Sequence, residues 1–301
     1  MTGLNVDIPR TIKTFDSAMR KKMLIKSIFY KRIFGGKGLE FDSYRDYSNN
    51  DDSSLIDWKA TMKNNGEPLV KQYVEERDLS IFFLIDVGDN MILGSGEKLK
   101  NETVAEISSS LAHLVLIAGD KAGFALYSDK IKVIKKPISG TNQFYSFVKE
   151  ITNVKNYGGK SDLVQALKFI RPYLRDTSAI FVISDFLRVD DKCLDELKKF
   201  IIQKETIGIM VRDINDNQIS DTQNEIVVED IDTGEQLLVN PSLIRQEYEK
   251  KALEQKQKVF DIFKKTGSDI IEIYTNADFI PPLVDFLKKR VKKKNIAGGD
   301  K

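Results

Sequence analysis

The sequence has little of the residue types on which many enzymes and metal proteins depend. Its 301 residues include one cysteine, Cys193, and one histidine, His113. A single cysteine excludes an intrachain disulfide and fits a reducing compartment. A single histidine excludes a Cys/His zinc site, and a Ser-His-Asp triad would have to use His113. That residue follows three serines on a predicted helix, which favours a surface or capped histidine over a catalytic one.

The sequence also lacks a long apolar run and a strong charge of one sign. No stretch approaches the ~20 apolar residues of a membrane span. The N-terminus shows no apolar core of a signal peptide, so we expect a cytoplasmic protein. The 47 Lys and Arg nearly balance the 45 Asp and Glu, and the formal charge of +2 is too small to indicate nucleic-acid binding. These features are typical of a globular protein without a membrane span.

The most informative stretch is residues 79–91, which read LSIFFLIDVGDNM. The continuous apolar run at 81–85 predicts a strand that is buried on both faces. The run ends on Asp86, turn-forming residues follow, and a helix is predicted from residue 97. A second buried run, AIFVIS at 179–184, also ends on an aspartate, Asp185. A buried strand followed by a polar loop and a helix predicts a βαβ unit.

The same alternation continues along the chain. Strands are predicted at 79–86, 122–128, 131–137, 179–184, 206–211 and 269–274. Helices are predicted at 97–118, 141–152, 162–174, 193–202, 241–265 and 278–294, and a hairpin at 225–239. This order predicts an α/β fold, a doubly wound and mostly parallel sheet with helices on both faces.

The residues before this domain follow a different pattern. Residues 10–34 predict an amphipathic helix with a basic face, either simply solvated or bound to an anionic partner. Residues 38–80 contain short strand-like pieces at 39–41 and 69–74 among turn residues. They hold too few apolar residues for a core of their own, so we expect them to pack on the following domain. We therefore divide the chain into 1–78, 79–294 and a flexible tail at 295–301.

The two strand-end aspartates are the candidate site. In a parallel sheet Asp86 and Asp185 emerge at the same edge, where ligands of such folds bind. If their strands are neighbours, the carboxylates repel each other unless a proton or a cation lies between them. Ser161 and Asp162 precede a helix at the same edge, and oxygen ligands of this kind suit Mg²⁺. The alternative is that each aspartate only caps the helix or loop that follows it.

Three motifs in this order resemble the metal-ion-dependent adhesion site of von Willebrand factor A domains. They are IDVGDNM at 85–91, GGKSDL at 158–163 and ISDF at 183–186. The resemblance implies five ligand positions for Mg²⁺ or Mn²⁺: Asp86, Gly88, Asn90, Ser161 and Asp185. Three of them depart from the family pattern: Gly88 has no side chain, Asn90 stands in place of a serine and Ser161 in place of a threonine. The side chains left as metal ligands are Asp86, Asn90, Ser161 and Asp185, in a degenerate site that holds a metal or only shapes the loop.

A second resemblance covers the segment before the domain. The blocks GLEF at 38–41, YRDY at 44–47, IDWKAT at 56–61, VKQY at 70–73 and EER at 75–77 resemble the signature of a bacterial family. It is number fifty-eight in the series of domains of unknown function. The resemblance implies an association with MoxR-type AAA+ ATPases and a role as an adaptor or chaperone-like partner, acting on an unknown client protein.

The signature residues admit two interpretations. Trp58, the only tryptophan, is expected to anchor the segment to the domain. The neighbouring charges form either an ion-pair network at that junction or, together with Trp58, a partner-binding surface. The candidate partner-binding residues are Arg45, Asp46, Asp57, Trp58 and Lys59.

Three functions follow from these observations. The first is a non-catalytic protein-interaction module. The second is a metal-dependent hydrolase that uses Asp86 and Asp185, although no general base is evident. The third is binding of nucleic acid or another anionic surface through the basic N-terminal helix.

Overall fold

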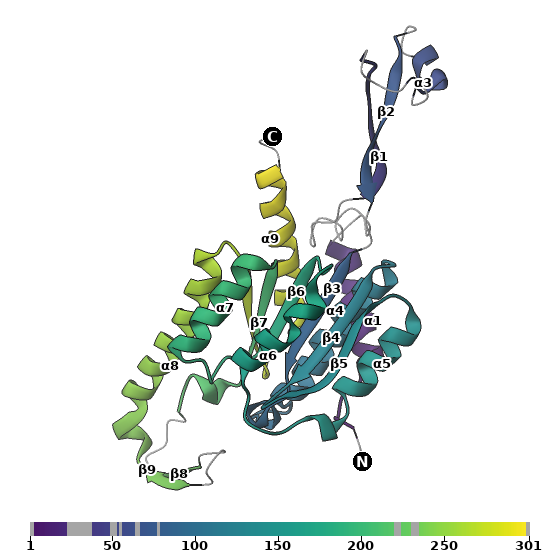
Figure 1. Ribbon diagram of the computed structural model, residues 1–301. Coiled ribbons are helices and arrows are strands. Elements are labelled where there is room, and N and C mark those ends of the chain that lie inside the picture. Colours follow the sequence, from purple (N-terminus) through teal and green to yellow (C-terminus); the bar gives the residue numbers. More distant parts are fainter. Residues whose placement is uncertain are drawn as a thin grey trace.

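Figure 1 shows the computed structural model of the chain. It describes residues 3–22, 38–48, 53, 56–63, 67–76, 79–219, 224–229 and 235–298. Within these residues, no helix combines the length and the apolar character that a bilayer crossing requires.

A six-stranded sheet forms the centre of the molecule, with the strand order β10-β7-β6-β3-β4-β5. Its strands are β3 (Ser80–Asp86), β4 (Lys121–Tyr127), β5 (Ile131–Ile138), β6 (Ala179–Ser184), β7 (Thr206–Arg212) and β10 (Asp269–Tyr274). Neighbouring strands are parallel except β5, which pairs antiparallel with β4. The prediction of an α/β fold with a mostly parallel sheet is confirmed.

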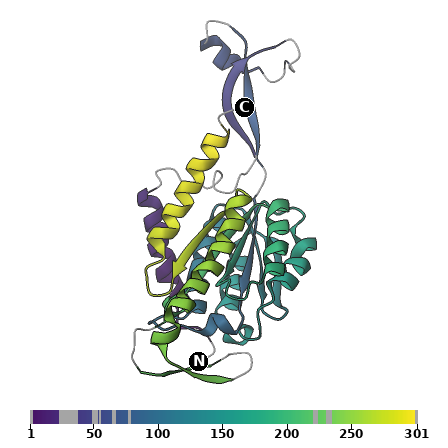
Figure 2. The ribbon, with the colours of Figure 1, turned by 90° about the vertical axis from the view of Figure 1, so that its left-hand side faces the viewer.

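Helices cover both faces of this sheet (Figure 2). One face packs against α1 (Ile8–Lys22), α4 (Lys100–Ile117), α5 (Thr141–Ile151) and α9 (Ile280–Gly298). The other packs against α6 (Leu163–Ile170), α7 (Asp191–Gln203) and α8 (Pro241–Lys265). In β3, Ile81, Phe83 and Ile85 contribute to the first core, whereas Phe82 and Leu84 contribute to the second. This is why the run is apolar at every position rather than at alternate ones.

The helix ends follow local sequence signals. The Asn240 side chain accepts a hydrogen bond from the Ser242 amide at 3.1 Å and caps α8. Helix α6 ends at Ile170 and a 3-10 turn that contains Pro172 follows it, as the proline predicts. Helix α9 runs to Gly298, beyond the predicted end at residue 294. The described part of helix α1 covers Ile8–Lys22, and the rest of the helix predicted over 10–34 lies outside the described residues.

The segment after α1 forms an arm, made of β1 (Gly38–Asp46), β2 (Leu69–Glu76) and the short helix α3 (Trp58–Lys63). Strands β1 and β2 pair antiparallel with each other. In both views the arm extends away from the sheet (Figures 1 and 2). The expectation that this segment packs on the following domain is therefore wrong. A second projection, the ribbon β8 (Ile226–Glu229) and β9 (Gln236–Val239), lies at the opposite end of the molecule.

Candidate functional site

The two strand-end aspartates lie on neighbouring strands. Strands β3 and β6 are parallel and adjacent, with Ile85 paired to Ile183. Asp86 and Asp185 therefore leave the sheet at the same edge, the carboxyl edge of the parallel strands. Both are almost closed to solvent, with 3% and 2% of their surface exposed. Buried carboxyl groups need either hydrogen-bond donors or a compensating charge. Asp86 has neutral donors, whereas Asp185 has a compensating charge.

Asp86 is surrounded by neutral donors. Its Oδ1 accepts hydrogen bonds from the Gly88 amide at 3.0 Å and the Ser161 hydroxyl at 2.5 Å. Its Oδ2 accepts one from the Ser184 hydroxyl at 2.8 Å and a longer one from the Tyr127 hydroxyl at 3.4 Å. These donors come from β4, β6, the loop after β3 and the loop before α6.

These donors do not outweigh the cost of burying the charge. Burial and the nearby Asp185 carboxylate raise the pKa of Asp86 from 3.8 to about 6, against the hydrogen bonds from Ser161, Gly88 and Ser184, which lower it. The same environment raises the pKa of the Tyr127 hydroxyl well above its ordinary value, chiefly through burial and then through Asp86. Asp86 thus has an unusually high affinity for a proton.

Asp185 is compensated by a cation of the chain itself. Its Oδ2 accepts a hydrogen bond from the Lys100 ammonium at 2.9 Å, and its Oδ1 accepts one from the Leu187 amide at 3.0 Å. The same ammonium lies 3.2 Å from Asp216 Oδ2 and 3.3 Å from Oδ1. Lys100 has no exposed surface. Burial alone would lower its pKa, but Asp185 and Asp216 outweigh burial and raise it, so the ammonium stays charged.

Lys100 and Asp216 are functional candidates that the sequence does not reveal. Lys100 opens a helix, where a lysine is usually solvated, and Asp216 lies in a 3-10 turn after β7. The only signal is the position of Lys100 in the first turn of α4, where the helix dipole disfavours a cation. A nearby carboxylate would explain that position, but the sequence does not show which one.

The loop after β3 leaves no space for the missing ligand. A Cβ atom on Gly88 would lie 2.0 Å from Ser161 Oγ and 3.0 Å from the Gly159 carbonyl oxygen. The Gly159 amide donates to Asp89 Oδ1 at 2.8 Å, and the Asp89 amide donates to the Gly159 carbonyl at 3.0 Å. This reciprocal pair fixes the two loops against each other. Asn90 is buried in the 3-10 turn that follows.

These residues do not fit the metal site that the sequence resemblance implies. Position 88 offers no ligand, Ser161 is bonded to Asp86, and the Lys100 ammonium already lies against Asp185. In the described part of the chain, no three His, Cys, Asp or Glu side chains are grouped so that they could hold a metal ion. The structure therefore brings Asp86, Ser161 and Asp185 to one edge, but in an arrangement that neutral donors and a lysine stabilise.

The candidate partner-binding residues lie on the arm. The Asp57 carboxylate caps α3, because its Oδ1 accepts from the amides of Lys59 at 3.0 Å and Ala60 at 3.2 Å. Its Oδ2 accepts from the Tyr44 hydroxyl on β1 at 3.0 Å. The Arg45 guanidinium donates to the Asp46 carbonyl oxygen at 3.2 Å. The expected anchoring role of Trp58 is wrong, because 65% of its surface is exposed.

A family model agrees with the sequence signature. The model described as "Protein of unknown function DUF58" matches residues 43–258. The chain belongs to the DUF58 family. This confirms the family that the signature blocks predict. No curated protein matches the sequence of this DUF58 protein.

Solved structures that resemble this DUF58 protein are distant from it. The conserved hypothetical protein BatB from Bacteroides thetaiotaomicron has a TM-score of 0.46 at 11% identity, with 71% of this chain and 99% of that chain covered. An aerotolerance-related membrane protein from Bacteroides fragilis has a TM-score of 0.48 at 11% identity, with the same coverage. The mussel byssus protein PTMP1 has a TM-score of 0.41 at 14% identity and covers 71% of this chain and 46% of its own. Similarity at this level carries no inference about function.

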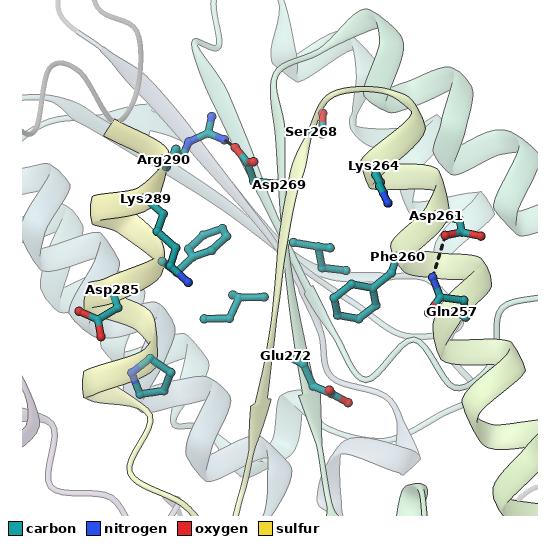
Figure 3. Close-up of a pocket in the computed structure, with 14 residues that line it drawn as sticks. Gln257, Phe260, Asp261, Lys264, Ser268, Asp269, Glu272, Asp285, Lys289 and Arg290 are labelled. Carbon is teal, nitrogen blue, oxygen red and sulfur yellow. Dashed lines mark hydrogen bonds and ion pairs between the residues drawn. The ribbon is translucent and has the colours of Figure 1, made fainter. Parts of the chain in front are cut away.

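A pocket of this DUF58 protein lies elsewhere, across the edge strand β10 between α8 and α9 (Figure 3). Several polar groups that line it are already paired. Arg290 forms ion pairs with Asp269 and Glu205. The Gln257 side chain donates to Asp261 at 2.8 Å. The pocket contains none of the strand-end residues, and it is a separate feature of the fold.

Proposed function

We propose that this DUF58 protein is a non-catalytic interaction module. It is an adaptor or chaperone-like partner of a MoxR-type AAA+ ATPase in the maturation or assembly of a client protein in the cytoplasm. In this proposal, residues 79–294 are a von Willebrand factor A-like domain whose metal site has degenerated. The observation that carries the proposal is the exposed tip of the arm.

The arm presents large apolar side chains that the fold does not need to expose. Trp58 is 65% exposed and Met62 is 83% exposed, and both lie on α3. Tryptophan and methionine are enriched at protein interfaces, and tryptophan is among the commonest residues at binding hot spots. An exposed pair of this kind, far from the sheet, supports a docking role.

The tip is also held in a defined shape. The Thr61 hydroxyl donates to the Asp57 carbonyl oxygen at 2.9 Å and accepts from the Leu69 amide at 3.0 Å. The Asp57 amide in turn donates to the Leu69 carbonyl oxygen at 2.9 Å. These bonds fix α3 to β2. A surface that is ordered before binding loses less entropy when the partner docks.

A second apolar surface lies at the other end of the molecule. On the ribbon β8–β9, Val227 pairs with Leu238 and Val228 pairs with Leu237. Because paired residues share a face and successive pairs alternate, apolar side chains occupy both faces of the ribbon. All four are exposed. Two separate apolar surfaces suit an adaptor, which must contact an ATPase and a client at once.

The strand-end carboxylates favour this role over hydrolysis. Asp86 and Asp185 are almost completely buried. Each is also engaged by donors of the protein. A catalytic carboxylate has to reach the substrate or a water molecule. The arrangement therefore supports a structural rather than a catalytic role for both.

The experiment uses the fact that the chain has one tryptophan. The protein labelled with 5-fluorotryptophan gives a single ¹⁹F signal from Trp58. Addition of a purified MoxR-type ATPase from the same genome should shift or broaden this signal. In parallel, Trp58→Ala should weaken the affinity measured by biolayer interferometry by about 30-fold, the effect of a hot spot of ~2 kcal/mol.

The matched control is Tyr145→Ala. Tyr145 is an aromatic residue on α5 that is 66% exposed, so it matches Trp58 in side-chain type and in exposed fraction. Its substitution should leave the affinity unchanged. An unaltered ¹⁹F signal, together with equal affinities of the wild type and Trp58→Ala, would contradict the proposal.

A further inference from the structure

We infer that the ammonium group of Lys100 takes the place of a divalent cation at the carboxyl edge of the sheet, so that this DUF58 protein holds Asp185 and Asp216 together without a metal. This role of Lys100 concerns the edge alone and does not depend on the proposed partner. Neither the family signature nor the adhesion-site motifs contain it.

The positive charge of Lys100 lies between two carboxylates. The ammonium contacts one oxygen of Asp185 at 2.9 Å and both oxygens of Asp216 at 3.2 and 3.3 Å. These three oxygens come from the residue after β6 and from the turn after β7, and Lys100 comes from α4. A divalent cation that bridged the two carboxylates would lie in the same place. Both cannot be present at once.

A lysine at this position is costly in free energy. Lys100 has no exposed surface, and a buried ammonium is strongly unfavourable unless it is paired. It also begins α4, where the partial positive charge of the helix N-terminus opposes a second positive charge. Attraction by nearby negative charges can offset both costs. The carboxylates of Asp185 and Asp216 provide that attraction.

On the Asp86 side, the remaining positions of the adhesion site are closed to a metal. The side chain that such a site needs at position 88 would collide with Ser161 and approach the Gly159 carbonyl. Ser161 is itself bonded to Asp86, whose other oxygen is engaged by Ser184. The sequence thus shows a lost metal ligand at Gly88, and the structure shows that the Lys100 ammonium provides a positive charge at the same edge. The ammonium compensates the carboxylates that a metal can no longer neutralise.

The first test measures binding of Mn²⁺ to the full-length chain by electron paramagnetic resonance. The wild type should show no saturable binding up to about 1 mM Mn²⁺. Lys100→Ser removes the ammonium, leaves a hydroxyl oxygen and opens space between the two carboxylates. This variant should gain one saturable Mn²⁺ site, and Asp185→Asn in the Lys100→Ser background should remove it.

The second test measures melting temperature and needs no metal. Lys100→Met keeps the volume of the side chain but leaves Asp185 and Asp216 uncompensated. It should lower the melting temperature by about 10 °C. Adding Asp185→Asn should restore part of that loss, because one unpaired charge is then removed. The control is Lys251→Met, which breaks an exposed ion pair of 2.7 Å with Glu247 and should change the melting temperature by less than about 2 °C.

Three results would contradict this role of Lys100. Saturable Mn²⁺ binding by the wild type that Asp185→Asn abolishes would overturn the inference. So would a folded Lys100→Ser variant that binds no more Mn²⁺ than the wild type. A Lys100→Met variant as stable as the wild type would overturn it as well, because the ammonium would then not be needed to hold the two carboxylates.

Discussion

Asp86 is a buried acid whose neutral form is favoured by its surroundings. Burial first, and the Asp185 charge second, raise its pKa from 3.8 to about 6. A folded-state pKa above the unfolded value means that the folded chain binds the proton more tightly. The contribution of Asp86 to the free energy of unfolding is therefore greatest at low pH, and it falls as the pH rises from about 4 to about 6.

This shift predicts a pH-dependent effect of Asp86→Asn. The variant cannot ionise at this position, so it should gain stability relative to the wild type as the pH rises from 4 to 7. The shift from 3.8 to about 6 corresponds to an upper limit of about 3 kcal/mol, at ~1.4 kcal/mol per pH unit. Urea denaturation of both proteins across this pH range measures it. A difference in unfolding free energy that does not change with pH would contradict the prediction.

Gly88 offers a second test at the level of single residues. Its φ of −68° is accessible to any residue, so only space restricts the position. Gly88→Ala places a methyl group 2.0 Å from Ser161 Oγ, and overpacking of this kind costs about 1–3 kcal/mol. The free energy of unfolding should fall by that amount in the wild-type background and by less in a Ser161→Ala background.

Gly96 provides the matched control for this prediction. A Cβ atom there would have only the Asn276 Cβ within reach, at 3.9 Å. Gly96→Ala should therefore be close to neutral in the same denaturation experiment. Equal effects of Gly88→Ala and Gly96→Ala would show that the loop after β3 adapts, and the account of crowding at position 88 would be wrong.

The strand-end rule predicts where Asp86 and Asp185 lie, but not what compensates them. Both aspartates end an apolar run, and the order of α/β elements places such residues at one edge. The same rule does not predict the role of Lys100, because its partner Asp216 is distant in sequence. Pairwise contacts between separate elements follow from packing, which no local pattern encodes. The physical demand for a proton or a cation between the carboxylates was foreseeable, whereas the source of the cation was not.

At the scale of elements, the local patterns predict most of the central domain. Strands β3, β6 and β7 are continuous apolar runs because both of their faces are covered. Helix α8 begins at Pro241 and ends at Lys265, where the Asn-Pro cap and the following Gly267 place its ends. These features depend on residues that are adjacent in the chain, and a sequence contains that information directly.

The arm shows where local patterns are insufficient. A segment poor in apolar residues can pack on a neighbouring domain, or its strands can pair with each other in solvent. Strands β1 and β2 pair with each other along their length, and water can satisfy the backbone groups on their outer edges, so no neighbouring strand is required. The size of Trp58 suggests burial, yet the side chain lies on the exposed face of a short helix. An exposed tryptophan is informative because burial would be its ordinary state.

At the scale of the whole molecule, the central domain is built from two parts of the chain, one before the arm and one after it. Phe15 and Met19 of α1 are buried in the same core as β3 and α4. The arm follows α1 in sequence and precedes β3, so it is an insertion between two parts of one packed body. Stability and docking should therefore reside in different segments of the chain.

Deletion of residues 38–76 tests that separation. Among the side chains whose burial is described, the core around Phe15 and β3 includes none from the arm, so the deleted protein should stay folded, with a melting temperature within about 4 °C of the wild type. Its affinity for the MoxR-type ATPase should be lost. Phe15→Ala should do the reverse: it should lower the free energy of unfolding by about 3–5 kcal/mol and leave the affinity of the folded fraction unchanged. Calorimetry and biolayer interferometry measure the two properties separately. If the deleted protein unfolds, the arm is part of the domain's core structure, and its exposure cannot be ascribed to docking.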